Sequence, residues 1–211
     1  MFITYEGIEG SGKSTQMEML ADYMEERGAT VVKTREPGGC QLGRRLRSML
    51  LDCRQTELTP RAELCLFLAD RCQHLAEIIL PALEAGHTVL CDRYTDSTIA
   101  YQGFGRGMDV ANLRALNQLA AGTLMPDLTF LLDLPVQTGL SRAGARNRIE
   151  GTVISEGRFD SESLDFHNRV REGYLEIARG SPERVKIIDA SRSAGEIFAD
   201  CVPFLEKPVH A

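Results

Sequence analysis

The sequence predicts an α/β protein in which helices cover both faces of a five-stranded parallel sheet, forming a three-layer sandwich. Five short, mostly apolar or β-branched runs recur along the chain, at residues 2–5, 30–33, 88–91, 128–132 and 185–188. Such runs are typical of strands that are buried on both faces. Longer segments with helical periodicity separate them, and this alternation favours parallel strands joined by right-handed crossovers.

Each element follows from its local pattern. The first run, FITY, precedes a glycine-rich turn and a segment whose apolar residues Met17, Leu20 and Met24 share one helical face. The runs TVVK and TVLC predict the second and third strands. A helix is predicted before the fourth strand, LTFLL, because apolar residues recur at helical spacing at Leu113, Leu116, Leu119 and Ala120. The run VKII predicts the fifth strand near the end of the chain.

Size and composition predict one domain over residues 1–211. The net charge of −6 argues against non-specific binding to nucleic acid or to an anionic membrane surface. No apolar run approaches the roughly 20 residues of a membrane span, and the first residues carry no leader pattern. The six cysteines form no C-x-x-C pair, as expected of thiols in a reducing compartment. We therefore expect a cytoplasmic protein.

A phosphate-binding loop (P-loop) follows the first strand. Residues 7–14, GIEGSGKS, fit G-x-x-x-x-G-K-[ST] between a strand and a helix, which is the context that the motif requires. Inward-pointing N–H groups and the helix N-terminus would hold the phosphates of a nucleoside triphosphate, Lys13 would reach the β- and γ-phosphates, and Ser14 would ligate Mg²⁺. The expected donor-binding residues are Gly7, Gly10, Ser11, Gly12, Lys13, Ser14 and Thr15.

The acceptor of the phosphoryl group is suggested by the absence of motifs typical of other P-loop proteins and by the positions of several arginines. The strings N-K-x-D and D-x-x-G of GTPases do not occur, and no further domain for a motor is present, which leaves kinases of small metabolites. If the acceptor is a phosphate, it is already largely ionised, and the protein must overcome repulsion between two anions. Arginines follow three of the predicted strands, at Arg35, at Arg93, and at Arg142, Arg146 and Arg148.

Several longer motifs resemble the thymidylate kinase family, in its bacterial type with lid arginines. They are, in order, TREPGG at 34–39, LFLADR at 66–71, DRY at 92–94, STIAYQG at 97–103 and PDLTFLLD at 126–133. The resemblance implies a P-loop nucleoside monophosphate kinase fold and the transfer of a phosphoryl group from ATP to dTMP in dTTP synthesis. It also implies a homodimer, Mg²⁺ as cofactor, and ATP and dTMP as partners, with neither nucleic acid nor membrane.

In that family, the residues that match Phe67 and Arg71 stack on the thymine ring and hydrogen-bond its O4. Their spacing puts both on one helical face, although a core Phe67 and a solvated Arg71 paired with Asp70 or Glu63 would fit the spacing equally. The resemblance also assigns Ser97, Thr98 and Gln102 to dTMP binding. It places Tyr101 where a 2′-hydroxyl would otherwise lie.

The resemblance implies roles for the charged residues as well. Arg93 would grip the acceptor phosphate with help from Arg35, which Pro37 would position, and Glu9 would face the sugar 3′-hydroxyl. Asp92 would hold Mg²⁺ through water, with Asp133 as the alternative. The expected catalytic residues are Lys13, Arg93, Arg142, Arg146 and Glu9.

A lid is expected at residues 140–158. Arg142 and Arg146 rank above Arg148 because their spacing puts both on one helical face, and Gly144 and Gly151 are expected to weaken the helix there. We expect adenine recognition near residues 189–192 and dimer contacts through helices at 64–75 and 113–119. Two other functions stay open at this point: a kinase for another nucleoside monophosphate or a deoxynucleoside, and a non-catalytic nucleotide-binding module.

Overall fold

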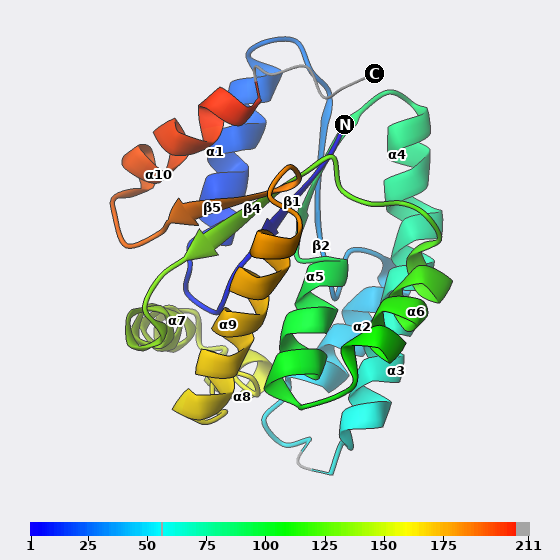
Figure 1. Ribbon diagram of the computed structural model, residues 1–211, viewed down its shortest axis with the longest axis vertical. Helices are drawn as coiled ribbons and strands as arrows, with labels where there is room; N and C mark the ends of the chain where they lie inside the picture. The colour runs from blue at the N-terminus through cyan, green and yellow to red at the C-terminus, as the bar shows by residue number, and fades with distance from the viewer. Residues whose placement is uncertain (56, 206–211) are drawn as a thin grey trace.

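The computed structural model describes residues 1–55 and 57–205 and contains a five-stranded sheet in which every pairing is parallel (Figure 1). The spatial order is β2-β3-β1-β4-β5. The strands are β1 (Phe2–Glu6), β2 (Val31–Arg35), β3 (Thr88–Asp92), β4 (Leu128–Asp133) and β5 (Val185–Asp189). This confirms the predicted fold class. Each strand runs at least one residue beyond its apolar run, so that a charged residue ends every strand at the carboxyl edge.

Helices connect the strands and cover the sheet. They are α1 (Lys13–Glu25), α2 (Gln41–Leu51), α3 (Pro60–His74), α4 (Leu80–Glu84), α5 (Thr95–Thr98), α6 (Val110–Ala121), α7 (Val136–Glu150), α8 (Val153–Glu156), α9 (Leu164–Gly180) and α10 (Ala194–Cys201). Wider π-helical turns cover Leu75–Ile79 and Ile99–Gly105, and a 3₁₀ turn covers Val202–Phe204. Among the described residues, no helix has both the length and the apolar character that a membrane crossing needs.

The sheet is buried between two helical layers. Tyr5 and Leu20 lie fully buried in one core cluster, and the Tyr5 hydroxyl donates to the Gln16 carbonyl of α1, so this face of β1 lies against α1. The alternate residues Phe2 and Val89 pack against Ile79 and other residues near α4 on the opposite face. α10 lies beside α1, whereas α9 and α5 cover the other face (Figure 1). Burial on both faces is the reason that the strands read as continuous apolar runs.

One expected feature differs at residues 140–158, where a lid is expected. α7 continues through Gly144 and ends only at Gly151, which adopts a left-handed conformation with φ 70°. The helix buries Val136, Gly139, Ala143 and Asn147, a stripe with helical spacing. Burial of this stripe outweighs the cost of about 1 kcal/mol that a glycine imposes inside a helix.

Candidate active site

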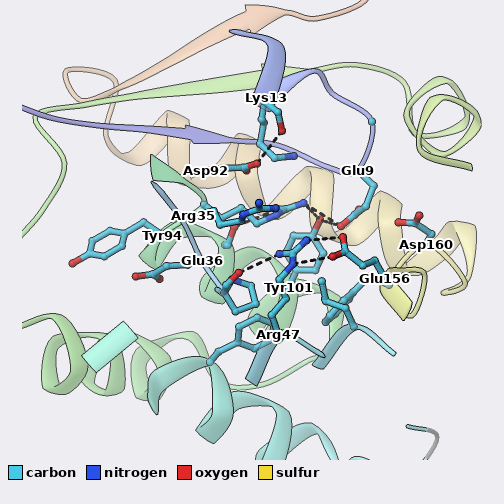
Figure 2. A pocket seen from close by; sticks show the side chains of 18 of the residues that line it. Glu9, Lys13, Arg35, Glu36, Arg47, Asp92, Tyr94, Tyr101, Glu156 and Asp160 are labelled. Carbon is cyan, nitrogen blue, oxygen red and sulfur yellow. Dashed lines mark hydrogen bonds and ion pairs between the residues drawn. The ribbon is translucent and has the colours of Figure 1, made fainter. Parts of the chain in front are cut away.

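A cavity of about 450 Å³ opens at the carboxyl ends of β1, β2 and β3 (Figure 2). This central cavity is lined by the P-loop, the ends of β2 and β3, α3, α5, α7 and α8. It brings together most of the residues that the sequence predicted: Glu9, Gly10, Lys13, Ser14, Thr15, Arg35, Pro37, Phe67, Arg71, Asp92, Arg93, Ser97, Thr98, Tyr101, Gln102 and Arg146. Gly7, Ser11, Gly12 and Arg142 do not line it.

The P-loop curls because its glycines adopt conformations that other residues rarely reach. Gly10 has φ 69°, and a Cβ there would lie 2.0 Å from the carbonyl oxygen of Gly139, so the turn has no room for a side chain. Lys13 begins α1 and donates from Nζ to the carbonyl oxygens of Gly7 at 3.2 Å and Ile8 at 3.0 Å. Burial, with repulsion from Arg93, lowers the pKa of Lys13 to about 8. An anion beside Nζ would reverse that shift.

Asp92 and Ser14 form an oxygen-donor pair at the mouth of the P-loop. Ser14 Oγ lies 3.5 Å from Asp92 Oδ2, while Asp92 Oδ1 is buried and has no hydrogen-bond partner within residues 1–55 and 57–205. Hard oxygen donors of this kind suit Mg²⁺, which commonly takes one or two protein ligands and completes its shell with water and phosphate. The alternative carboxylate, Asp133, is engaged elsewhere, because Arg171 binds its two oxygens at 2.7 and 2.8 Å.

Arg93 occupies a constrained position directly after β3. It is the one non-glycine residue with positive φ, 71°, in the part of the chain that the structure describes. Its N–H donates to the Tyr5 carbonyl, and the next N–H, of Tyr94, donates to Glu6 Oε1 at 2.7 Å. These bonds hold a backbone conformation that costs energy, and such conformations cluster at functional sites.

The Arg93 guanidinium reaches both walls of the cavity. Nη2 donates to Glu9 Oε1 at 3.1 Å and to the Tyr101 hydroxyl at 2.9 Å. Nη1 donates to the Tyr174 hydroxyl at 2.9 Å and to Ser97 Oγ at 3.3 Å. Tyr174 and Glu6 are not predicted from the sequence. The Glu6 carboxylate accepts hydrogen bonds from both Ser97 and Tyr174. Nothing local in the sequence marks them, because they meet only through packing of α9 on β1.

Glu9 is held in its charged form despite lying within the P-loop. Burial favours the neutral carboxyl, but His167 and the Arg93 charge outweigh it and hold the pKa of Glu9 well below its ordinary value. The Tyr101 hydroxyl donates to Glu9 Oε1 at 2.6 Å. Glu9 Oε2 lies 3.4 Å from His167 Nδ1, a second neighbour that sequence reasoning missed. Glu9 therefore faces the cavity as a carboxylate beside Arg93.

Arg71 is a buried, fully oriented donor. Its Nε donates to Glu36 Oε2 at 2.8 Å, Nη1 to Thr98 and Asn117, and Nη2 to the Tyr94 carbonyl. The pairing with Glu36 excludes the alternative of a solvated Arg71 beside Asp70 or Glu63. A guanidinium carries five N–H groups, so one N–H on Nη2 is left over. Both Arg71 and the half-buried Phe67, one helical turn earlier on α3, line the cavity.

The predicted helical spacing of Thr98 and Gln102 is modified by a π-helical turn. α5 ends at Thr98, and the chain continues as a π-helix over Ile99–Gly105. Tyr101 and Gln102 both line the cavity from this wider turn, together with Ser97 and Thr98. π-Helical turns of this kind often occur at functional sites. The Glu36–Pro37 peptide bond, directly before this cavity-lining proline, is cis.

The structure separates the two lid arginines that the sequence ranked together. Arg146 lines the cavity, whereas Arg142 donates to the carbonyl oxygens of Ala190 at 2.9 Å and Ser191 at 3.3 Å. Those carbonyls belong to the segment where adenine recognition was expected. Residues four apart on a helix differ by about 40° in direction, which is enough here to direct the two side chains to different neighbours.

Several cavity residues were missed altogether. Arg47 of α2 binds Glu156 of α8 through Nη2 at 2.9 Å, and this ion pair closes the end of the cavity opposite Lys13 and Asp92 (Figure 2). Phe159 and Asp160 also line the cavity from the segment after α8. Arg47 could have been suspected as one more arginine near the active edge, but its approach to α8 depends on tertiary packing.

Comparison with known proteins identifies close relatives over nearly the whole chain. A family model described as "Thymidylate kinase" matches residues 5–201. The curated thymidylate kinase of Desulfovibrio desulfuricans is 62% identical over 206 residues, covering 98% of this chain and 95% of the relative. That of Nitratidesulfovibrio vulgaris is 55% identical over 202 residues, covering 96% and 90%. The crystal structure of thymidylate kinase from Ehrlichia chaffeensis aligns with a TM-score of 0.79 at 35% identity, covering 98% of both chains.

Proposed function

We propose that this chain, which belongs to the thymidylate kinase family, performs its reaction in the central cavity. The reaction transfers the γ-phosphoryl group of ATP to dTMP and gives dTDP and ADP. The observation that carries the assignment is the position of Arg93, whose guanidinium lies between Glu9, Ser97 and two tyrosine hydroxyls. A cation fixed at that point, beside a P-loop lysine that also lines the cavity, suits an acceptor that is itself an anion.

The acceptor nucleotide would lie across the cavity from α3 to the P-loop. Its phosphate would meet Arg93, with Arg35 beyond it and Pro37 shaping the loop between, and Glu9 would receive the 3′-hydroxyl. Phe67 would stack on the base, and Arg71 would donate its remaining N–H to O4. Ser97, Thr98 and Gln102 would border the nucleoside, and Tyr101, whose hydroxyl is bonded to Glu9, would exclude a ribose 2′-hydroxyl.

The donor triphosphate would lie in the P-loop against the N-terminus of α1. The residues that would bind its phosphates, mainly through backbone N–H groups, are Gly7, Gly10, Ser11, Gly12, Lys13, Ser14 and Thr15. Lys13 would exchange its present carbonyl partners for phosphate oxygens, which restores its full charge. Ser14 and Asp92 would hold Mg²⁺, and the ion supplies neutralisation of the charge on the donor phosphates when bound.

In the transfer step, an ionised oxygen of the acceptor phosphate forms a bond to the γ-phosphorus while the bond from that phosphorus to the β,γ-bridging oxygen breaks. The nucleophile needs no protein base, because a phosphate monoester is already largely ionised at neutral pH. Lys13 and Arg93 would stabilise the charge on the transferring and accepting groups. Arg146 is the lid arginine on the cavity side, and Arg142 would join it only after leaving the carbonyls of Ala190 and Ser191.

We also propose one catalytic domain whose lid covers residues 140–158. The ion pair between Arg47 and Glu156 supports this, because it joins the lid to α2 across the cavity and would separate when the lid moves. Closure excludes water, which protects the phosphoryl group from hydrolysis.

Assembly and location are further parts of the proposal. Leu64, Leu75 and Leu113, from the helices expected to form a dimer, are buried within the subunit, whereas Leu119 of α6 is 81% exposed. We propose a homodimer that covers Leu119, which sedimentation of Leu119→Glu against the wild type would test. The six free cysteines support a reducing, cytoplasmic location.

The assignment is tested by offering the purified enzyme dTMP, dUMP, dCMP and thymidine side by side, with ATP and Mg²⁺, and following ADP release. We expect dTMP to give the highest kcat/KM. Faster turnover of thymidine would contradict an anionic acceptor at Arg93. ADP release that no acceptor stimulates would indicate a module that binds nucleotide without transferring phosphate to it.

A further inference from the structure

Glu63 is a buried carboxylate at the start of α3 that connects three parts of the molecule. It is 1% exposed, and its Oε1 accepts from Gln102 Nε2 at 2.8 Å and from Arg106 Nε at 3.3 Å. Its Oε2 accepts from Arg158 Nη2 at 2.6 Å and from Arg106 Nη2 at 3.1 Å. Burial opposes ionisation, but the hydrogen bonds and charges of Arg106 outweigh it and lower the pKa of Glu63. The residue is therefore an acceptor only.

An acceptor-only partner fixes which end of the Gln102 amide faces it. The Nε2 group must point to Glu63, because the amide oxygen would meet a carboxylate oxygen with no proton between them. The opposite end, Oε1, accepts no hydrogen bond from any residue in 1–55 and 57–205, and Gln102 lines the central cavity. The amide consequently offers the cavity an acceptor.

The neighbouring group has the opposite polarity. Arg71 is donor-only, retains one N–H, and is joined to Thr98, one turn before Gln102, by a bond of 3.0 Å. The cavity wall thus presents a donor next to an acceptor. The O4 and N3–H of thymine or uracil match this order, whereas the N4 amino group and unprotonated N3 of cytosine reverse it at both positions.

We propose that Glu63 is a positioning residue for base selection: by fixing the polarity of the Gln102 amide, it makes the cavity accept pyrimidines that carry an N3–H and reject cytosine nucleotides. The inference rests on the proposed function, since it needs the base to lie between Arg71 and Gln102. Glu63 itself touches no substrate and acts through Gln102.

The decisive variant is Glu63→Gln. Two arginines donate to the Oε2 position at 2.6 and 3.1 Å, whereas the Oε1 position receives from an arginine only the longer bond of 3.3 Å, from Arg106 Nε. The new amide therefore keeps its oxygen at the Oε2 position and presents its NH₂ to Gln102. Gln102 must then turn its oxygen toward residue 63 and its NH₂ toward the cavity. Steady-state kcat/KM would be measured for dTMP, dUMP and dCMP at pH 8. We expect the dTMP preference over dCMP, about 10³-fold or more in the wild type, to fall at least about tenfold.

The dTMP to dUMP ratio is an internal control, because both bases have the same O4 and N3–H, and this ratio should stay within about twofold. Arg106→Gln is the matched control variant. It removes one ion pair from Glu63 but leaves the carboxylate facing Gln102, so it should lower the melting temperature and keep the wild-type dTMP preference over dCMP. A general loosening of the site would instead lower both ratios in both variants.

Two outcomes would overturn the inference: a Glu63→Gln enzyme that folds and keeps the wild-type dTMP to dCMP ratio, or an Arg106→Gln enzyme that loses it equally. If Glu63→Gln does not fold, the side-chain amide protons of Gln102 in the wild type supply the test by NMR. Strong protection from exchange, with and without dTMP, supports the bond to Glu63, and rapid exchange refutes it. Failure of the wild type to use dTMP would instead contradict the proposed function.

Discussion

Replacement of Arg93 by glutamine separates the two nucleotide sites and so tests the central assignment. The guanidinium side chain is 18% exposed and already makes four hydrogen bonds within the cavity. If it binds the acceptor phosphate through two charge-assisted bonds of about 1.5 to 3 kcal/mol each, its loss costs about 3 to 6 kcal/mol. That corresponds to a fall of roughly 10²- to 10⁴-fold in kcat/KM for dTMP, whereas the KM for ATP should change less than about threefold.

The same substitution should destabilise the fold for a separate reason. Glu9, 12% exposed, lies 3.1 Å from Arg93 and would lose this cation. Breaking a buried ion pair by removing one partner costs about 3 to 5 kcal/mol, and partial exposure places this pair at about 3 kcal/mol, the lower end. Adding Glu9→Gln removes the uncompensated charge. The double variant should therefore regain most of the lost stability without regaining activity on dTMP.

The assays are initial rates with each nucleotide varied in turn, together with urea unfolding of the wild type, both single variants and the double variant. A rise in the KM for ATP as large as the loss in kcat/KM for dTMP would refute the placement of Arg93 at the acceptor. Recovery of dTMP activity in the double variant would show that Arg93 acts only by neutralising Glu9.

Three further results are expected. Phe67→Ala should weaken nucleotide binding by about 1 to 3 kcal/mol through loss of stacking, measured by calorimetry against Phe67→Tyr as control; unchanged affinity in a folded variant would contradict the stacking role. Because burial, with repulsion from Arg93, lowers the pKa of Lys13 to about 8, its charge is lost above that pH in the free enzyme, so kcat/KM for ATP should fall as pH rises through about 8. A profile that stays flat to pH 9.5 would oppose this. Burial, then repulsion from Asp96, raises the pKa of Glu6 to about 7. The folded state therefore holds a proton that the unfolded state releases near pH 4.5. The stability that this proton confers is lost as pH rises through about 7. Relative to the wild type, Glu6→Gln should therefore gain on the order of 3 kcal/mol of stability between pH 5 and pH 8, as followed by thermal unfolding, and a constant difference would show that Glu6 does not titrate in this range.

Local patterns predicted a large part of this protein correctly. The five strands appear where the apolar runs lie, and α1 begins at Lys13, as the P-loop motif implied. Both depend on neighbours in sequence: a continuous apolar run along a strand that is buried on both faces, and glycines whose backbone closes a turn. The strand ends gather Arg35, Asp92 and Arg93 at one edge because parallel strands place their carboxyl ends together.

Patterns of spacing were less reliable where packing competes with them. Gly144 does not interrupt α7, because the buried stripe of that helix outweighs its propensity. Arg142 and Arg146 share a helix, yet carbonyls from the distant segment after β5 engage the first. Such outcomes depend on what a side chain meets across space, which spacing within one helix does not encode.

The chain's order of residues therefore determined the sheet, the phosphate loop and the edge at which chemistry occurs, since each follows from interactions among residues a few positions apart. Only the tertiary structure decided how the functional groups are oriented. Glu63 faces Gln102 from 39 positions away, and Tyr174 reaches Arg93 from 81. The charge and polarity of the cavity therefore arise from contacts that form only when α3, the π-helical turn Ile99–Gly105 and α9 pack together.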